Sequence, residues 1–410
     1  MPHIERITDV PEAAVAGVKS RFEQRGATVK VTQQGSTSLY TLEATYPDGS
    51  DALAGLGHVG LLAAKANLEA PLAAGAEAGA SGVAVGAASA AGSGASVLTA
   101  TQAQTAKAIV NIFETGVVRG RYDQVTLIPG DTGHLTYGRS QTTLASGLLH
   151  DLLALYAGNA GARFAKRLSP YMSRAAERDL SLDTDTGFAN LLRACADDLV
   201  MRETQDAFFD LAFWRPAVES ARAMGLTQPL SIAVVYDSRV HGSWAKLRDE
   251  TNAKDGSVAQ LGERSWIQAY VRRRLNWLAQ SPRPDLRATV YRMDAFQRLI
   301  DQDRWGLALP LVVRGEEISA LTLAAEPPGC YTGPAPGTRN VGLSSPLLRG
   351  LDVRLVQLAL SDAGEPVKAD GVFGDQSAKS LSRVQTARGK PATGSADPAL
   401  VEELVRTVFG

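Results

Sequence analysis

Two carboxylates in the central part of this 410-residue sequence have the types and surroundings that acid and base catalysis requires. Glu114 follows an apolar helix face that ends at Phe113, and these neighbours would desolvate its carboxyl and favour the protonated form of a general acid. Asp131 lies in a Gly-rich turn, which would leave a carboxylate ionised and hold a water beside it. Such a pair can cleave a glycosidic bond, because one carboxyl protonates the leaving oxygen and the other activates water. On type and spacing alone, the pair also fits an ordinary Glu at a helix end and an ordinary Asp in a turn.

Apolar residues at helical spacing predict the elements that position this pair. The apolar residues between Ala106 and Phe113 predict a helix that ends close to Glu114. The same periodicity recurs through residues 101–325, which include Leu148 to Leu155. We therefore expect a mainly α domain over this block.

Composition divides the rest of the chain. Residues 11–25 predict a short amphipathic helix, and residues 29–32 and 39–46 predict two strands. The Ala-, Gly- and Ser-rich stretch 70–100 predicts a flexible tether, with a membrane-active or packed helical segment as the alternative. The predicted divisions are a small helix-strand-strand unit, an Ala/Gly-rich tether, the α domain, a Pro/Gly linker and a C-terminal domain, over residues 1–50, 51–100, 101–325, 326–345 and 346–410.

The composition also excludes several kinds of function. Lys and Arg total 42 against 43 Asp and Glu, so the chain has no broad cationic field and we expect no nucleic-acid partner. Cys195 and Cys330 cannot form a disulfide framework, and the five histidines have no metal-ligand spacing. No nucleophile elbow, phosphate loop or dinucleotide motif is present in a supporting context. We therefore expect neither a metal nor a cofactor, and no stable membrane span.

A longer pattern around the two carboxylates resembles a known family. Glu114, followed by Ile-Pro-Gly-Asp-Thr-Gly-His-Leu-Thr-Tyr-Gly over 128–138, resembles the bacterial chitosanases, glycoside hydrolase family 46 of the lysozyme-like superfamily. The resemblance extends over roughly residues 104–312. Its later blocks are residues 214–226, 235–242, 269–274 and 291–294. It implies a mainly α, lysozyme-like, two-lobed catalytic domain.

The resemblance also implies catalytic roles. Glu114 would be the general acid, Asp131 the general base and Thr136 the hydroxyl that positions the attacking water. Tyr122 could contact a sugar or have an ordinary packing role. The substrate-binding residues expected in this segment are Tyr122, Gly130, His134 and Tyr137.

A supporting ion network is implied as well. Asp237, Arg274 and Arg292 would lie buried behind Glu114, where the arginines orient the acid and Asp237 offsets part of their charge. Taken singly, Arg274 could face solvent and Asp237 could be a surface helix residue.

The C-terminal domain resembles the three-helix peptidoglycan-binding module of cell-wall hydrolases. The carrying motifs are the apolar helix 351–360 and the turn Asp370-Gly-Val-Phe-Gly, in which Gly371 and Gly374 permit tight geometry and Asp375 caps the next helix. Such a module raises the effective concentration of the enzyme at an insoluble polymer. The alternative is a domain that merely packs against the enzyme.

Two departures from the chitosanase pattern bear on the substrate. The sequence reads Asp131-Thr-Gly where the family usually has an Arg beside the base, and Ser146-Gly-Leu148 where the family has Thr-Gly-Asp. Without that last carboxylate, a glucosamine ammonium loses a charge-assisted hydrogen bond. We therefore expect inverting hydrolysis of the β-1,4 bonds of peptidoglycan, as in a muramidase-like antibacterial effector or endolysin. The alternatives are a chitosanase acting on chitosan and a non-catalytic wall-binding protein.

The N-terminus has no cationic start followed by an apolar run, which a signal peptide would require. We expect synthesis in the cytoplasm and action at the cell wall, in the periplasm or outside the cell, after delivery by lysis or by secretion machinery. An immunity protein would then be a further partner.

Overall fold

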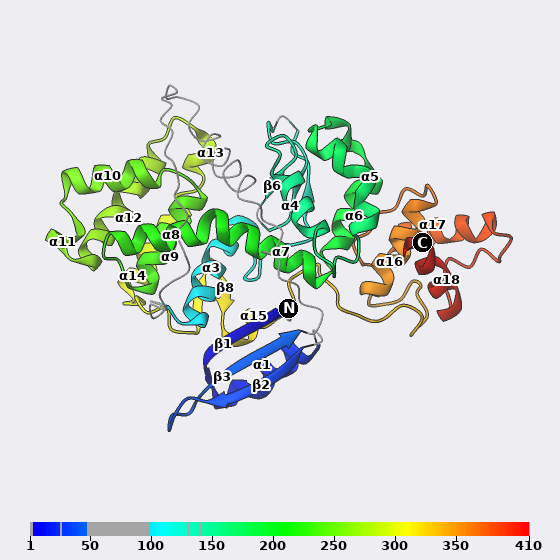
Figure 1. The fold of residues 1–410 in the computed structure, drawn as a ribbon, viewed down its shortest axis with the longest axis horizontal. Coiled ribbons are helices and arrows are strands. Elements are labelled where there is room, and N and C mark those ends of the chain that lie inside the picture. The colour runs from blue at the N-terminus through cyan, green and yellow to red at the C-terminus, as the bar shows by residue number, and fades with distance from the viewer. Residues whose placement is uncertain (1–2, 25–26, 47–97, 130, 140, 410) are drawn as a thin grey trace. The chain divides into compact units, whose positions relative to one another are not determined.

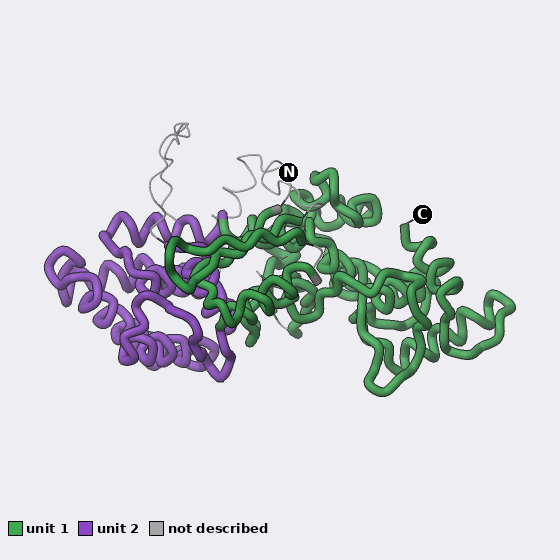
Figure 2. The backbone as a smooth tube through the Cα atoms, turned by 90° about the horizontal axis from the view of Figure 1, so that it is seen from below, with its two compact units in different colours: residues 1–57, 114–210, 319–410 green, residues 58–113, 211–318 purple. Residues whose placement is uncertain are grey.

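The computed structural model describes residues 3–24, 27–46, 98–129, 131–139 and 141–409. The chain forms two compact units, each of which is assembled from separate stretches of sequence (Figure 2). The first unit contains residues 1–57, 114–210 and 319–410, and the second contains residues 58–113 and 211–318.

The first unit begins with a small antiparallel sheet in the order β1-β3-β2 (Figure 1). Its elements are β1 (His3–Pro11), α1 (Glu12–Gln24), β2 (Thr28–Gln33) and β3 (Leu39–Tyr46). Val18 and Phe22 of α1 are fully buried, as are Leu42 and Ala44 of β3. The predicted helix and two strands are confirmed, and β1 is an additional strand.

A bulge explains why the sequence did not predict β1. Ile7 pairs with Leu42 and Val10 pairs with Tyr40, so β1 contains one extra residue between them. Asp9 lies in this bulge with φ of 57°. The buried residues of β1 are therefore three positions apart, and the two-residue period of a regular strand is lost.

The segment with the predicted active-site loop forms a second small sheet followed by helices. The sheet has the order β4-β5-β6. Its strands are β4 (Val125–Thr126), β5 (Thr136–Tyr137) and β6 (Thr142–Thr143). The helices are α4 (Leu148–Ala157), α5 (Ala165–Ala176), the 3-10 helix η1 (Leu180–Thr184), α6 (Thr186–Cys195) and α7 (Leu199–Phe209).

The second unit is almost entirely helical. Its core helix is α9 (Pro229–Val240), in which every residue from Pro229 to Ser238 is buried, and which contacts α8, α10 and α12. The α-helices are α3 (Ala100–Thr115), α8 (Arg215–Ala223), α10 (Trp244–Lys254), α11 (Val258–Leu261), α12 (Glu263–Ala279), α13 (Pro284–Arg287) and α14 (Tyr291–Asp301). The π-helix η2 (Asp210–Trp214) and the hairpin strands β7 (Leu311–Val313) and β8 (Glu316–Ile318) complete the set.

Three helices at the C-terminus belong to the first unit. They are α16 (Leu351–Asp362), α17 (Asp375–Ala387) and α18 (Pro398–Phe409), and they follow the short α15 (Ala320–Leu323). The central helix α16 contacts α17, α18 and also α6. The mainly α fold with a small N-terminal α+β unit and a C-terminal three-helix domain is therefore confirmed.

The segment predicted as a Pro/Gly linker has defined contacts. Cys330 is buried in an apolar cluster with Tyr122 and Ala196. The backbone N–H of Tyr331 donates a hydrogen bond to Asp197 Oδ1 at 2.8 Å. These contacts fix the segment to Tyr122 and to the connection between α6 and α7 in its own unit.

The predicted tether 51–100 lies outside the described residues except for its last three positions. In the described parts of the chain, no helix combines the length and the apolar character that crossing a bilayer requires.

Candidate active site

Glu114 lies in the last turn of α3, and Gly116, with φ of 73°, follows the helix end. Ile109, Ile112 and Phe113 are buried, whereas Glu114 is exposed. Successive helix residues turn by about 100° around the axis, so the position after Phe113 leaves the buried face. The expected desolvation of Glu114 is therefore wrong, because its side chain is exposed.

Asp131 is held in the predicted turn. Its backbone N–H donates to the carbonyl oxygen of Ile128 at 3.0 Å, and its Oδ1 accepts from the N–H of Gly133 at 3.2 Å. The carboxylate is exposed, so it can still accept a hydrogen bond from water. Gly130, predicted to bind substrate, lies outside the described residues.

Thr136 and His134 lie together at the start of β5. The hydroxyl of Thr136 donates to the carbonyl oxygen of His134 at 3.1 Å. His134 has φ of 59°, a left-handed conformation that is uncommon outside glycine. Thr136 is buried and pairs with Thr126 and Thr143 across the sheet.

Asp183 fixes this strained position, and the sequence did not predict it. One carboxylate oxygen lies 2.8 Å from His134 Nδ1, and the other accepts from the N–H of Leu135 at 2.8 Å. Asp183 lies in η1, about fifty residues further along the chain, so no local spacing indicates the pairing. Because Nδ1 is engaged, Nε2 of the half-buried His134 is the ring nitrogen left for a ligand.

Tyr122 and Tyr137, both predicted to bind substrate, are buried in the structure. Tyr122 is 3% exposed, and its hydroxyl donates to Asp206 Oδ1 at 2.7 Å. Arg139 forms an ion pair with the same carboxylate and lies over the Tyr122 ring. Burial, reinforced by Asp206, raises the pKa of Tyr122 above its usual range, and burial also raises the pKa of Tyr137. Both tyrosines are packed inside the unit, which is the alternative role considered for Tyr122, and their roles in substrate binding stay predictions.

The structure brings the three residues of the predicted ion network together in the second unit. Arg274 Nη1 donates to Asp237 Oδ2 at 2.5 Å, and Arg292 Nη1 donates to Asp237 Oδ1 at 2.8 Å. All three side chains are buried. Burial alone would raise the pKa of Asp237, but the charges of Arg292 and Arg274 outweigh it and lower that pKa.

His241, at the C-terminal end of α9, is a member of this network that the sequence did not single out. Its Nδ1 lies 3.0 Å from Arg274 Nη2. Burial, together with the positive charges of Arg292 and Arg274, lowers the pKa of His241 to about 3. His241 is therefore neutral and accepts this hydrogen bond.

The network reaches the end of α3, next to Glu114. The guanidinium of Arg292 lies over the ring of Phe113 at 5.5 Å, and the hydroxyl of Tyr291 donates to the carbonyl oxygen of Phe113 at 3.0 Å. These contacts fix the residue that precedes Glu114. A direct action of the network on the Glu114 carboxyl stays a prediction.

Known proteins resemble this chain in two regions. Residues 108–311 match glycosyl hydrolase family 46, and residues 349–404 match the peptidoglycan binding domain. A chitosanase of Bacillus subtilis (strain 168) is 28% identical over 238 residues, which cover 54% of this chain and 85% of that protein.

Solved structures of chitosanases also match. The complex of a Gynuella sunshinyii family 46 chitosanase with chitotetraose is 23% identical, with a TM-score of 0.46, and covers 54% of this chain and 98% of that chain. The native chitosanase of Bacillus subtilis MY002 is 26% identical, with the same TM-score and the same coverage.

The carboxylates Glu114 and Asp131 both lie within residues 108–311, the region that matches glycosyl hydrolase family 46. The chain therefore contains a glycosyl hydrolase family 46 domain over residues 108–311 and a C-terminal peptidoglycan-binding domain over residues 349–404.

Proposed function

We propose that this enzyme hydrolyses the β-1,4 bonds of peptidoglycan glycan strands at the bacterial cell wall, with inversion at the anomeric carbon. The observation that carries this proposal is the attachment of the peptidoglycan-binding domain to the unit that holds both Glu114 and Asp131. The attachment is a buried polar interface rather than a flexible link.

Arg354 of α16 is the centre of that interface. Its side chain is fully buried and donates to the carbonyl oxygens of Arg193 and Gly329. Its Nε lies 3.1 Å from Asp197 Oδ2, and its Nη2 lies 3.5 Å from Asp123 Oδ2. A buried guanidinium cannot be solvated by water, so it needs these partners. Because they come from the catalytic domain and the connecting segment, they hold the C-terminal domain in one orientation.

Asn190 of α6 adds a second fixed contact. Its amide nitrogen donates to the carbonyl oxygen of Val367 at 2.8 Å, and its amide oxygen accepts from the N–H of Ala369 at 2.9 Å. Both hydrogen bonds are buried. The α6 helix therefore binds the backbone of the C-terminal domain at two positions, on either side of Lys368.

A binding domain held in this way presents one polymer to the catalytic residues. A flexibly tethered binding domain raises the local concentration of the polymer around the enzyme. A binding domain that is fixed to the enzyme also restricts the orientation in which the polymer approaches the catalytic residues. This supports peptidoglycan as the polymer that both domains meet.

The loop after the base supports the same substrate. Leu148 is buried at the start of α4, after Gly147 with φ of 85°. This position therefore offers no carboxylate to a glucosamine ammonium. An N-acetylated sugar has no ammonium group, so the missing carboxylate does not weaken its binding.

In the proposed reaction, Glu114 protonates the leaving glycosidic oxygen while the Asp131 carboxylate takes a proton from water on the opposite face of the sugar. The Thr136 hydroxyl, whose proton is donated to the His134 carbonyl, keeps its oxygen lone pairs for that water. The water oxygen bonds to the anomeric carbon as the bond to the leaving oxygen breaks. No covalent glycosyl-enzyme forms.

The test is product analysis with the full-length enzyme on purified sacculi and, in parallel, on fully deacetylated chitosan. We expect soluble muropeptides from sacculi and an initial α-anomer at the new reducing end. Glucosamine oligomers from chitosan with no release from sacculi would overturn the peptidoglycan assignment in favour of a chitosanase, the activity named for the Bacillus subtilis relative. Turnover of neither polymer would favour a non-catalytic wall-binding protein.

A further inference from the structure

The second unit contains a surface groove that the proposed reaction does not use. It lies between α10 and α12 and has a volume of about 370 Å³. This falls within the range of about 300–1,000 Å³ that is typical of small-molecule sites. None of its lining residues belongs to the Asp237 network or to the Glu114 and Asp131 pair.

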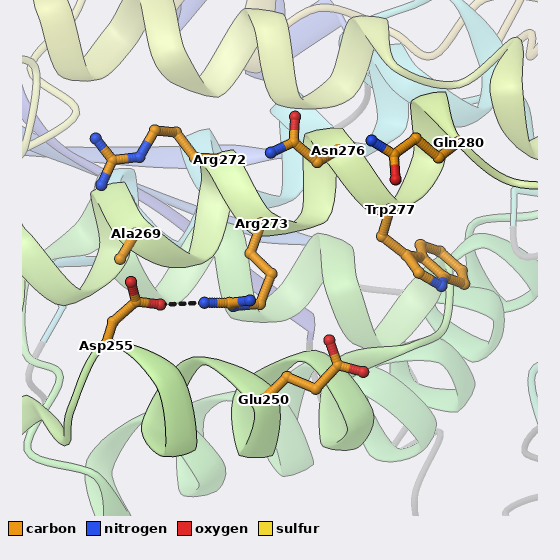
Figure 3. Close-up of a pocket in the computed structure, with 8 residues that line it drawn as sticks. All are labelled: Glu250, Asp255, Ala269, Arg272, Arg273, Asn276, Trp277 and Gln280. Atoms are coloured by element: carbon orange, nitrogen blue, oxygen red, sulfur yellow. Dashed lines mark hydrogen bonds and ion pairs between the residues drawn. The ribbon is translucent and has the colours of Figure 1, made fainter.

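An indole forms one end of the groove. Trp277 is half-buried, and it points from α12 towards the groove beside α10 (Figure 3). The exposed Lys246 lies 5.7 Å from the ring centroid. The negative face of an indole attracts positively polarised C–H groups, which line one face of a β-linked pyranose ring.

A row of polar side chains continues along the same helix. Arg272, Asn276 and Gln280 are spaced by four residues, so they share one exposed face of α12 (Figure 3). Among the described residues, neither the amide of Asn276 nor that of Gln280 has a side-chain hydrogen bond. Each amide can therefore donate to one hydroxyl or N-acetyl group and accept from another.

The charges in the groove are mixed. Arg273 forms an ion pair with Asp255 and donates to the Thr251 hydroxyl at 3.2 Å, so this pair is already satisfied. Glu250 and Arg272 remain, with opposite charges and no ion pair within the described part of the chain.

This balance narrows the class of ligand. The carboxylates of Glu250 and Asp255 would repel a polyanion. Nucleic acid binding also needs a net cationic surface, which this groove does not offer. A lipid or an apolar peptide would need a mainly apolar lining, but the groove is lined by charged and amide side chains around one tryptophan. A neutral or weakly charged ligand rich in hydroxyl and amide groups fits this lining.

We propose that this groove is a second, non-catalytic binding site for a hexosamine unit of a β-1,4-linked amino-sugar chain. The sugar ring packs on Trp277, and its hydroxyls and nitrogen substituent bind Asn276, Gln280 and Glu250. Glucosamine and N-acetylglucosamine share this chemistry, and they differ in whether Glu250 meets an ammonium.

The test observes Trp277 itself and does not depend on turnover. The full-length Glu114→Gln protein, labelled with ¹⁵N, is titrated with tetramers of glucosamine and of N-acetylglucosamine while its indole N–H signals are recorded. The chain has five tryptophans, and Trp277→Phe identifies the relevant signal by its absence. The other four signals report that the fold is intact.

We expect the Trp277 signal to shift with at least one tetramer, and Asn276→Ala with Gln280→Ala to weaken that binding about tenfold or more. A shift with the glucosamine tetramer that is lost in Glu250→Gln assigns the ammonium contact, and a shift with the N-acetylated tetramer assigns the amide row. The matched control is Gln302→Ala, an exposed amide outside the groove. A Trp277 signal that stays unchanged with both tetramers at millimolar concentration overturns the proposal, whatever the enzyme cleaves.

A second measurement uses the active enzyme. Trp277→Ala should release product from the insoluble polymer several-fold more slowly and keep its kcat/KM on a soluble tetramer. An equal loss on both substrates would contradict a site that only binds polymer.

Discussion

Arg354 of the peptidoglycan-binding domain forms a buried ion pair with Asp197 of the catalytic domain, with Nε and Oδ2 3.1 Å apart. Both side chains are almost completely excluded from solvent. Asp123 lies 3.5 Å from the same guanidinium, so two carboxylates share one cation. This cluster joins the two domains, and it has consequences for stability and for pH dependence.

Replacing Arg354 should destabilise the protein strongly. Arg354→Met leaves Asp197 and Asp123 without their shared cation, and the loss from breaking a buried pair is about 3–5 kcal/mol. Urea unfolding at pH 8, above the raised pKa of Asp197, followed by circular dichroism measures this change. The control Lys379→Met removes an exposed cation from the same domain and should change the free energy of unfolding by less than about 0.5 kcal/mol. Equal small effects in both variants would show that the pair does not hold the domains together.

The same cluster should make stability fall as pH rises towards neutrality. Burial raises the pKa of Asp197 to about 7 although Arg354 opposes it, and burial also raises the pKa of Asp123. An unfolded Asp titrates near about 3.9, so between about pH 4 and pH 7 the native state binds the extra proton and stability decreases with pH.

Asp197→Asn isolates this effect. The wild type should lose about 2 kcal/mol of unfolding free energy relative to the variant between pH 5 and pH 7. The slope arises because unfolding releases about one proton per molecule throughout this range. Urea unfolding at pH 5, 6 and 7 measures it. Parallel pH profiles for the two proteins would refute a raised pKa at Asp197.

Asp183 should act as a positioning residue for the loop that carries the base. Asp183→Asn keeps its size but weakens its contact to His134, so the strained φ of His134 would relax and Thr136 would shift. We expect kcat to fall about tenfold to a hundredfold with a smaller change in KM. Glu177→Gln, an exposed carboxylate change between α5 and η1, should leave both constants unchanged. A change confined to KM would place Asp183 in substrate binding instead.

Removing the buried carboxylate of the second unit should be costly. Asp237→Asn leaves Arg274 and Arg292 buried without their shared anion, and we expect a loss of about 3–5 kcal/mol in thermal or urea unfolding. Asp294→Asn, an exposed carboxylate on α14, is the matched control. Stability equal to that control would mean that the network contributes little.

Glu114→Gln should abolish hydrolysis, because the amide cannot protonate the leaving oxygen. Loss of a general acid reduces kcat by about 10²–10⁴-fold. Glu114 is exposed, so the variant should fold and bind sacculi like the wild type. Turnover at the wild-type rate would count against the assignment of the acid.

Local pattern was enough to predict several elements and the position of the two carboxylates in them. The helical spacing of Val18 and Phe22 predicted α1, and the apolar run to Phe113 predicted the end of α3 beside Glu114, because periodicity records which face of a helix is buried. The strand β1 was not predicted, because the bulge at Asp9 interrupts the two-residue alternation of buried and exposed side chains.

The sequence by itself determined the helices, the Gly-rich turn of Asp131 and the family to which these motifs belong, since each is written in residues close together in the chain. Only the tertiary structure decided that Tyr122 is buried, that Asp183 holds His134 and that Arg354 locks the C-terminal domain to Asp197. Those contacts join residues that are far apart in sequence. Their burial and charge pairing arise only when the whole unit packs, so no local spacing could encode them.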